Sequence, residues 1–170
     1  MVSDNQVMKT VPLAEGEPTW VFPPESVTPS LMASLLASSG RLLEIASLLP
    51  HGRAGWSGSG LEYNVFPSGQ RSLSGWAEND QVTFLVELLP PGFYPDGAPQ
   101  QWEVTADISV RCDAKNDCGM HSVEEFTPNS YATAEDAVAA VEKAAGWLLD
   151  RCRAVPPSDW RTRDPRAGHA

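Results

Sequence analysis

Apolar and polar side chains alternate without interruption from Trp102 to Cys112. The apolar positions are Trp102, Val104, Ala106, Ile108, Val110 and Cys112, and the positions between them are Glu103, Thr105, Asp107, Ser109 and Arg111. A period of two predicts a β-strand with one dry face and one wet face. A wet face is typical of antiparallel sheets, because parallel strands are usually covered on both faces. We therefore expect a central strand of an antiparallel sheet.

Two other segments repeat apolar residues at helical spacing. In the first, Thr28 can cap free backbone amides, Pro29 suits the first helical position and Pro50 ends the pattern, which predicts a helix over about 29–49. Its apolar stripe consists of Leu31, Leu35, Ser38, Leu42, Ile45 and Leu49, with Met32, Leu36, Leu43 and Ala46 beside it. The apolar face of this helix should therefore be wide.

The second helix is predicted over about 134–153. Thr133 and Asp136 form a capping box at its start, and two prolines at 156–157 stop the chain beyond its end. Its apolar stripe consists of Ala137, Val141, Ala144, Ala145, Leu148 and Cys152. Both helices can therefore present a dry face to the sheet.

Further strands are predicted before the alternating segment. Residues 80–89 form a strongly apolar strand, and residues 61–66 and 71–77 form a hairpin. Residues 51–60 are rich in glycine and serine and are predicted to form a flexible loop. Residues 19–22 precede two prolines, so they can form only an edge strand or an extended arm.

Residues 119–126 should return antiparallel beside the alternating strand, but two registers are open. If the numbers of paired residues add up to 230, Met120 and Phe126 face the core. If they add up to 231, His121 and Val123 face the core. A slip of one residue exchanges the two faces of the strand.

Together these elements predict an α+β domain, in which an antiparallel sheet of about four to five strands packs one face against two α-helices. Residues 18–155 should form this single domain, because a chain of 170 residues fills one core and seldom two. Residues 1–17 should form a flexible N-terminal arm, and residues 156–170 a basic C-terminal tail.

Acidic residues dominate the charge of the chain. There are 22 Asp and Glu against 12 Lys and Arg, which gives a formal net charge of -10. This charge disfavours nucleic acid and anionic membranes as partners, since phosphate binding depends on Lys and Arg. No uninterrupted apolar run approaches the roughly 18 residues of a membrane span, and the start lacks the basic and apolar regions of a signal peptide. We expect a cytoplasmic protein.

Arginine is concentrated near the C-terminus. Residues 151–170 contain five arginines and two aspartates, which gives this segment +3 and leaves -13 on residues 1–150. Such a segment could dock on the acidic body or on a partner, or it could remain a disordered solubilising end. Arg161 and Arg163 are its candidate binding residues.

One cluster resembles a metal site, with Cys112, Cys118 and His121 close in sequence and Cys152 further on. Three thiolates and an imidazole could bind zinc, but structural sites usually pair cysteines about two to four residues apart, and Cys152 lies in an apolar stripe. A disulfide between Cys112 and Cys118 would need the 230 register and would be strained or redox-labile. A Cys118–His121 catalytic pair would need the turn to extend to His121. We expect no metal and no other cofactor.

Carboxylates offer the other candidate chemistry. Glu103 and Asp107 share the wet face of the alternating strand, and Glu124 or Glu125 could lie beside them on the next strand. Clustered carboxylates can raise the pKa of one member into a catalytic range. A solvated sheet face explains the same pattern in a chain with 22 acidic residues.

The glycines of the 51–60 segment do not indicate a phosphate-binding loop, because they lack the Gly-Lys-Ser/Thr element of such loops.

Six tryptophans give a clue to binding. Trp102 and Trp147 lie on patterned elements and should pack in or beside the core. Trp56 lies in the glycine-rich segment and Trp160 lies among the C-terminal arginines, so neither has an obvious apolar partner nearby in sequence. Exposed aromatic residues near arginine anchor many protein interfaces. The alternative is that each tryptophan folds back onto the core.

These features favour a non-catalytic protein-binding domain whose acidic surface suits a basic protein partner. Small acidic neutralisers of basic toxins (immunity-like) and small assembly chaperones both fit this description. The candidate binding residues are Trp56, Trp160, Glu103, Asp107, Arg161 and Arg163. The alternative is a small enzyme or small-molecule-binding domain that uses a pocket between sheet and helices.

Overall fold

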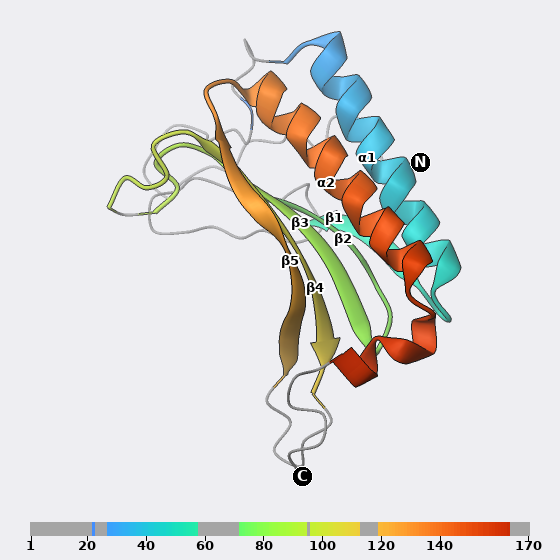
Figure 1. The fold of residues 1–170 in the computed structure, drawn as a ribbon. Coiled ribbons are helices and arrows are strands. Elements are labelled where there is room, and N and C mark those ends of the chain that lie inside the picture. Colours follow the sequence, from blue (N-terminus) through green and yellow to red (C-terminus); the bar gives the residue numbers. More distant parts are fainter. Residues whose placement is uncertain (1–21, 23–26, 58–71, 95, 113–118, 164–170) are drawn as a thin grey trace, which may run out of the picture.

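A five-stranded antiparallel sheet carries two α-helices on one face (Figure 1). The computed structural model describes residues 22, 27–57, 72–94, 96–112 and 119–163. In chain order the elements are α1 (Pro29–Leu48), β1 (Arg53–Ser57), β2 (Leu73–Glu78), β3 (Val82–Leu89), β4 (Trp102–Arg111), β5 (Met120–Tyr131), α2 (Ala134–Ala154) and the short 3-10 turns η2 (Pro157–Asp159) and η3 (Arg161–Arg163). The predicted α+β class and both predicted helices are confirmed.

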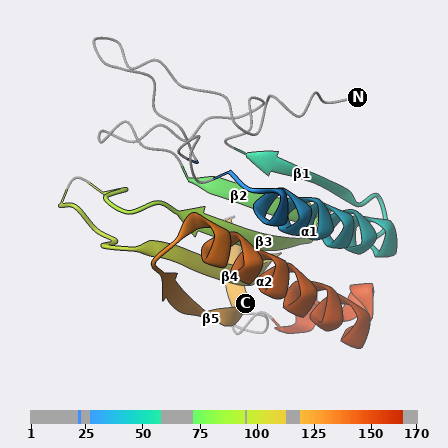
Figure 2. The same cartoon turned by 90° about the horizontal axis from the view of Figure 1, so that it is seen from above.

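The strands lie in the order of the sequence, β1-β2-β3-β4-β5, and each is antiparallel to its neighbours. β1 and β5 therefore run in the same direction. Because α1 leads into β1 and α2 follows β5, the two helices also run in the same direction. Figure 2 shows them side by side above the sheet, where α1 contacts β1 and β2 and α2 contacts β3, β4 and β5.

Polar contacts join the two helices near their starts, middles and ends. The Thr28 hydroxyl donates a hydrogen bond to Glu135 Oε2 at 2.8 Å, and Arg41 forms an ion pair with Glu142 at 3.3 Å. Arg153 pairs with Glu44 at the far end. The predicted caps are also present, since the hydroxyls of Thr28 and Thr133 each accept a backbone N–H of the first turn at 3.1 Å.

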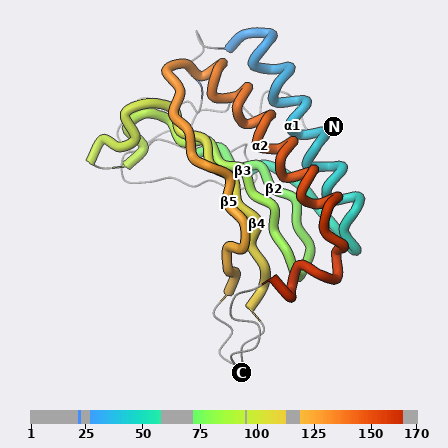
Figure 3. Tube along the Cα trace, viewed as in Figure 1, coloured from blue at the N-terminus to red at the C-terminus, as the bar shows by residue number. Residues whose placement is uncertain are grey.

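The alternation that defines β4 separates the two faces of the sheet. Its apolar residues are buried against the helices, and the residues between them are half-buried or exposed. All six residues of each predicted helical stripe are buried as well. As predicted, β4 is an interior strand with one dry face, although β3 is the middle one of the five. Figure 3 traces β4 and β5 side by side along their length.

Residues 53–57 form an edge strand, so the prediction of a flexible loop over 51–60 is wrong for this part. Glycine is compatible with the strand because it leaves room for an aromatic ring from the neighbouring strand. Gly55 lies opposite Trp76, and Trp56 lies opposite Gly75. A Cβ atom on Gly55 would come within 2.8 Å of the Trp76 ring, and one on Gly75 within 2.7 Å of the Trp56 ring.

The predicted hairpin between 61–66 and 71–77 is also wrong in its pairing. Residues 73–77 pair with β1 on one side and with β3 on the other. Residues 61–66 lie outside the described residues, as do residues 19–21 of the predicted edge strand. The described neighbour, Phe22, is buried and stacks on Trp102 with 5.8 Å between ring centroids.

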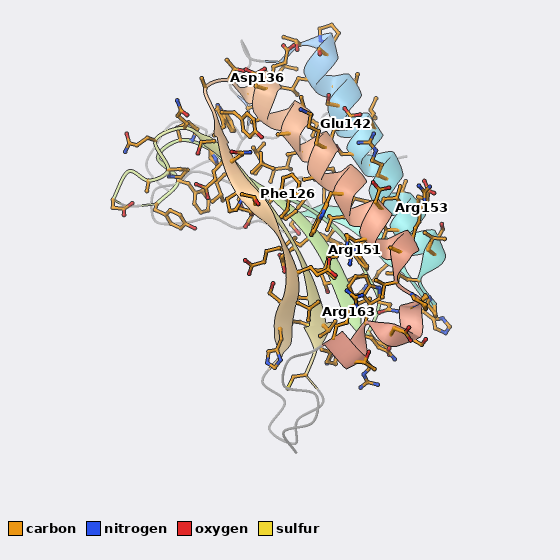
Figure 4. All side chains as sticks on the ribbon, in the orientation of Figure 1. Phe126, Asp136, Glu142, Arg151, Arg153 and Arg163 are labelled. Atoms are coloured by element: carbon orange, nitrogen blue, oxygen red, sulfur yellow. The ribbon has the colours of Figure 1, made fainter. Side chains whose placement is uncertain are left out.

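β5 starts in the 231 register and then leaves it. Val110 pairs with His121, but two β-bulges shift the pairing, so that Ala106 lies opposite Phe126 and Val104 opposite Asn129. The shift turns Phe126 toward the helices, where its ring lies 5.5 Å from that of Trp147 (Figure 4). A single register could not place both Val123 and Phe126 against the core, and the bulges do so.

The first part of the C-terminal segment packs against the folded domain. Trp160 has no exposed surface and packs edge-on against Phe84, with 5.4 Å between ring centroids. The Arg163 guanidinium lies 5.3 Å from the centre of the Trp160 ring. Residues 156–163 of the predicted tail therefore cover the core, whereas residues 164–170 lie outside the described part.

The wide apolar face predicted for the first helix is only partly buried. Leu36 and Leu43 are exposed by 64% and 62%. By length and mean hydropathy, 1.3 over 18 residues, α1 could cross a membrane, although a third of that window is buried here. Core helices of globular proteins meet the same criterion, and α1 packs its buried stripe on β1 and β2.

Candidate functional site

Carboxylates gather on the outer face of the sheet, which is the face turned away from the helices. Asp107 on β4 lies directly opposite Glu125 on β5. Glu87 on β3 points to the same face, because it pairs with Thr105 on β4. We call Glu87, Asp107 and Glu125 the carboxylate cluster. Glu103 lies on this face too, further along β4.

Hydroxyl groups hold the cluster in place. The Ser109 hydroxyl donates a hydrogen bond to Asp107 Oδ2 at 2.5 Å, and the Ser122 hydroxyl donates one to Glu125 Oε1 at 3.2 Å. The Ser74 hydroxyl lies 3.3 Å from Glu87 Oε1. These donors orient the carboxylates but supply no positive charge.

Two members of the cluster have perturbed acidity. Burial raises the pKa of Asp107 above its ordinary value, the nearby Glu125 raises it further, and the hydrogen bond from Ser109 opposes the rise. Burial also raises the pKa of Glu87, with a smaller contribution in the same direction from Asp107. The cause in both cases is an anion held partly out of water beside another anion.

No carboxylate of the cluster has an ion pair within the described part of the chain. Four other acids of the described part do have ion pairs: Glu44, Glu78, Glu124 and Glu142. Glu124 lies one residue before Glu125 but faces the helix side. Its carboxylate accepts hydrogen bonds from Nε and Nη2 of Arg151, each at 2.6 Å, and from Nη1 of Arg163 at 2.5 Å (Figure 4). The hydrogen bond from Arg151 lowers the pKa of Glu124. The two neighbouring glutamates therefore differ in ion pairing as well as in the face of the sheet on which they lie.

A hollow of about 350 Å³ adjoins the cluster between β4 and β5. Its lining combines polar and apolar side chains: Thr105, Ala106, Asp107, Ser122, Glu125, Phe126 and Pro128. The pairing shifts between Val104 and Ala106, opposite the part of β5 that contains Pro128, and such a bulge tolerates a proline because proline cannot donate to the ladder. The hollow could receive one cationic side chain.

Neutralising Asp107 should stabilise the protein. Its pKa is raised in the folded state, so the folded protein binds that proton more tightly than the unfolded chain does, and ionisation costs stability at neutral pH. Like charges directly opposite on neighbouring strands are destabilising. Asp107→Asn should therefore raise the free energy of unfolding by about 0.2 to 1 kcal/mol at pH 7. The gain should fade as the pH falls through the Asp107 pKa.

Urea melts of Asp107→Asn and wild type between neutral pH and about pH 4 measure this difference. Glu103→Gln is the matched control, because Glu103 lies opposite Leu89 and Ser130 instead of a carboxylate, and should change stability by about 0.5 kcal/mol or less. An equal loss of stability in both variants would contradict the proposed repulsion.

The other predicted binding residues have different surroundings. Trp56 is half-buried at the opposite edge of the sheet and donates its Nε1–H to Ser39 Oγ at 2.9 Å. Trp160 lies in the core, so of the two options given for this ring the structure shows the one in which it folds back. It can therefore contact a partner only after a rearrangement. Arg161 and Arg163 belong to η3, and Arg163 lies against Trp160 and Glu124. These residues support the fold instead of forming one surface with Glu103 and Asp107.

Cysteine chemistry receives little support. Cys112 and Cys152 are buried, and burial raises the pKa of the Cys152 thiol to about 11, which disfavours the thiolate needed by a nucleophile or metal ligand. His121 already belongs to β5, and the described residues contain no group of three side chains arranged for a metal ion. Cys118 lies outside the described residues, so the candidate zinc set and the candidate 112–118 disulfide also fall partly outside the described part of the chain.

The alternative function needs a pocket between sheet and helices. In the described part of the chain that interface is filled by the apolar core, and a groove of about 130 Å³ opens at its margin between α1 and β1.

Of the carboxylate cluster, the sequence predicted Asp107 and gave Glu125 as one of two options, but Glu87 was missed. The polar positions of the 80–89 strand were visible, but their neighbours across the sheet were not.

A functional proposal for this chain has to rest on the geometry of its fold and of the carboxylate cluster. No protein-family model, curated protein or solved structure matches this chain.

Proposed function

We propose that this chain is a non-catalytic protein-binding domain that recognises a basic protein through the outer face of β3, β4 and β5. The observation that carries the proposal is the carboxylate cluster, in which three acids from three strands face solvent without an ion pair among the described residues. An acidic interaction protein of the immunity-like or chaperone-like kind matches this feature.

A cationic partner would supply what the cluster lacks. Asp107 and Glu125 repel each other across the strands, so the folded protein carries a stability cost that a bound cation would relieve. The hollow beside them has room for a lysine or arginine side chain, and the hydroxyls of Thr105 and Ser122 line its wall. Exposed charges around such an anchor increase the association rate and set specificity more than they increase affinity.

The remaining features of the proposal follow from composition. A net charge of -10 makes nucleic acid and anionic membranes poor partners, and binding of this kind needs no cofactor. We propose that the protein acts in the cytoplasm.

Capture of proteins from a lysate by the immobilised full chain tests the proposal. We expect retention of a basic protein at low salt and weaker retention at moderate salt, because salt screens exposed charge pairs. Asp107→Asn/Glu125→Gln should retain roughly tenfold less of the same protein, since close charge pairs contribute on the order of 1.5 kcal/mol or more.

The matched control is Asp80→Asn/Asp150→Asn, which removes the same amount of charge from two exposed acids outside the cluster. It should retain the partner as the wild type does. Failure to retain any protein at either salt concentration, or an equal loss in both double variants, would rule out the cluster as the binding site.

A further inference from the structure

A second surface, unrelated to the carboxylate cluster, lies along α1. Of the five large apolar side chains that are exposed in the described part, three belong to this helix: Leu36, Leu43 and Leu48. Leu36 and Leu43 share one face of α1 with the half-buried Met32 and with the small residues Ser39, Gly40 and Ser47. We call these six residues the α1 strip.

The α1 strip lies at the margin of the molecule. Figure 2 shows α1 on the β1 side of the helix layer, whereas β5, which carries Glu125, forms the opposite edge of the sheet. Beside the strip runs the groove of about 130 Å³, lined by Ser39, Leu42, Leu43, Ala54, Gly55 and Trp56. Because Ser39 and Leu43 belong to both, the α1 strip and the groove form one continuous surface.

The strip carries no charge in a chain with a net charge of -10. α1 has two charged residues, Arg41 and Glu44, and both form ion pairs with α2, away from the strip. Depletion of charge is typical of interface cores. Two copies that met through this strip would bury no charged side chain and would keep their carboxylate clusters far apart.

The arrangement of the strip is self-complementary. Leu36 and Leu43 flank the small pair Ser39 and Gly40, and Gly40 has open space where a Cβ would lie. If two copies of α1 cross antiparallel at this pair, Leu36 of each copy lies beside Leu43 of the other, over the groove. The small residues at the axis let the helices approach closely. A two-fold axis with identical surfaces on both copies is the commonest symmetry of protein dimers.

We propose that the α1 strip binds a second copy of this chain, forming an antiparallel α1–α1 dimer centred on Ser39 and Gly40. The 20 residues of α1 span about 30 Å. One helix face of this length buries less than the about 800 Å² per partner of a standard interface, so the dimer is weak and dissociates in the micromolar range.

Sedimentation of the full chain across the micromolar range tests the proposal. The wild type should rise from the monomer mass toward twice that mass as its concentration increases. Leu36→Glu and Leu43→Glu should each weaken association roughly tenfold or more, because each would bury a charge without a partner. Leu48→Glu is the matched control, since Leu48 is an exposed leucine of the same helix outside the strip, and it should associate like the wild type.

Cross-linking locates the axis. In a Cys118→Ser background, Gly40→Cys should form a disulfide-linked dimer under mild oxidation, and Leu48→Cys should not. A wild type that stays monomeric, or a dimer unaffected by Leu36→Glu, overturns the proposal. Flotation of monomeric wild-type protein with phosphatidylcholine vesicles, lost in Leu36→Glu, would overturn it in favour of a lipid surface. A Gly40→Cys chain that does not cross-link overturns the proposed axis.

Discussion

Replacing Ile108 with alanine should lower the free energy of unfolding by about 2 to 5 kcal/mol, as cavities left by large aliphatic side chains do. Ile108 has no exposed surface and lies on the helix side of β4, directly opposite Phe84 on β3 and Glu124 on β5. It belongs to the same core cluster as Val141 and Leu148 of α2. Strands on both sides and a helix above surround the site, so it cannot collapse easily around the cavity.

Ser109→Ala is the control for this prediction. Ser109 is the next residue of β4 and faces the outer side, where its hydroxyl donates a hydrogen bond to Asp107. Loss of that bond should cost about 0.5 to 1 kcal/mol. Urea melts of the two variants compare the dry and wet faces of one strand directly. Equal losses would mean that β4 is covered on both faces.

Replacing Trp160 with alanine should cost about 3 to 5 kcal/mol, which is the range for large aromatic residues in a core. The ring is fully buried, packs edge-on against Phe84 and is covered by the Arg163 guanidinium. Its loss should also release η2 and η3 from the sheet, because Trp160 lies between them and is the buried aromatic of this segment.

Trp160→Phe separates packing from polarity. It keeps an aromatic ring and removes the indole N–H, which has no hydrogen-bond partner among the residues that the structure describes. Because an unsatisfied buried donor is costly, the phenylalanine variant should lose much less stability than the alanine variant. Thermal or urea unfolding gives both values. A loss below about 1 kcal/mol for Trp160→Ala would show that the C-terminal segment is not docked in solution.

The elements that were predicted correctly are those whose signal lies within one segment. β4 follows from its period of two, and α1 and α2 follow from their apolar stripes together with the capping hydroxyls of Thr28 and Thr133. Each of these signals depends on residues a few positions apart. The sheet class then follows from the wet face of β4.

The errors occur where the deciding partner is distant in sequence. β1 contains a glycine that is compatible with a strand because Trp76 lies on it, and Trp160 is buried because Phe84 lies against it. The β5 register depends on two bulges, which no period reveals. The carboxylate cluster has the same origin, since Glu87, Asp107 and Glu125 become neighbours only when three strands pair.

The two proposed surfaces would bind their partners by different interactions, one electrostatic and one apolar. The carboxylate cluster is a concentration of like charge that costs stability in the free protein, whereas the α1 strip is an uncharged apolar surface. They lie near opposite edges of the sheet. A dimer formed through α1 would therefore leave both carboxylate clusters accessible, and two linked sites increase the avidity for a partner that spans them.

The central claim is that a basic partner binds the outer face of the sheet. Backbone chemical shifts of the nitrogen-15-labelled chain, titrated with the captured partner, test it most directly. The account predicts the largest shifts at the outward-facing positions Thr105, Asp107, Ser109, Ser122 and Glu125, with α1 and α2 little changed. Shifts confined to the two helices, with β4 and β5 unaffected, would contradict it.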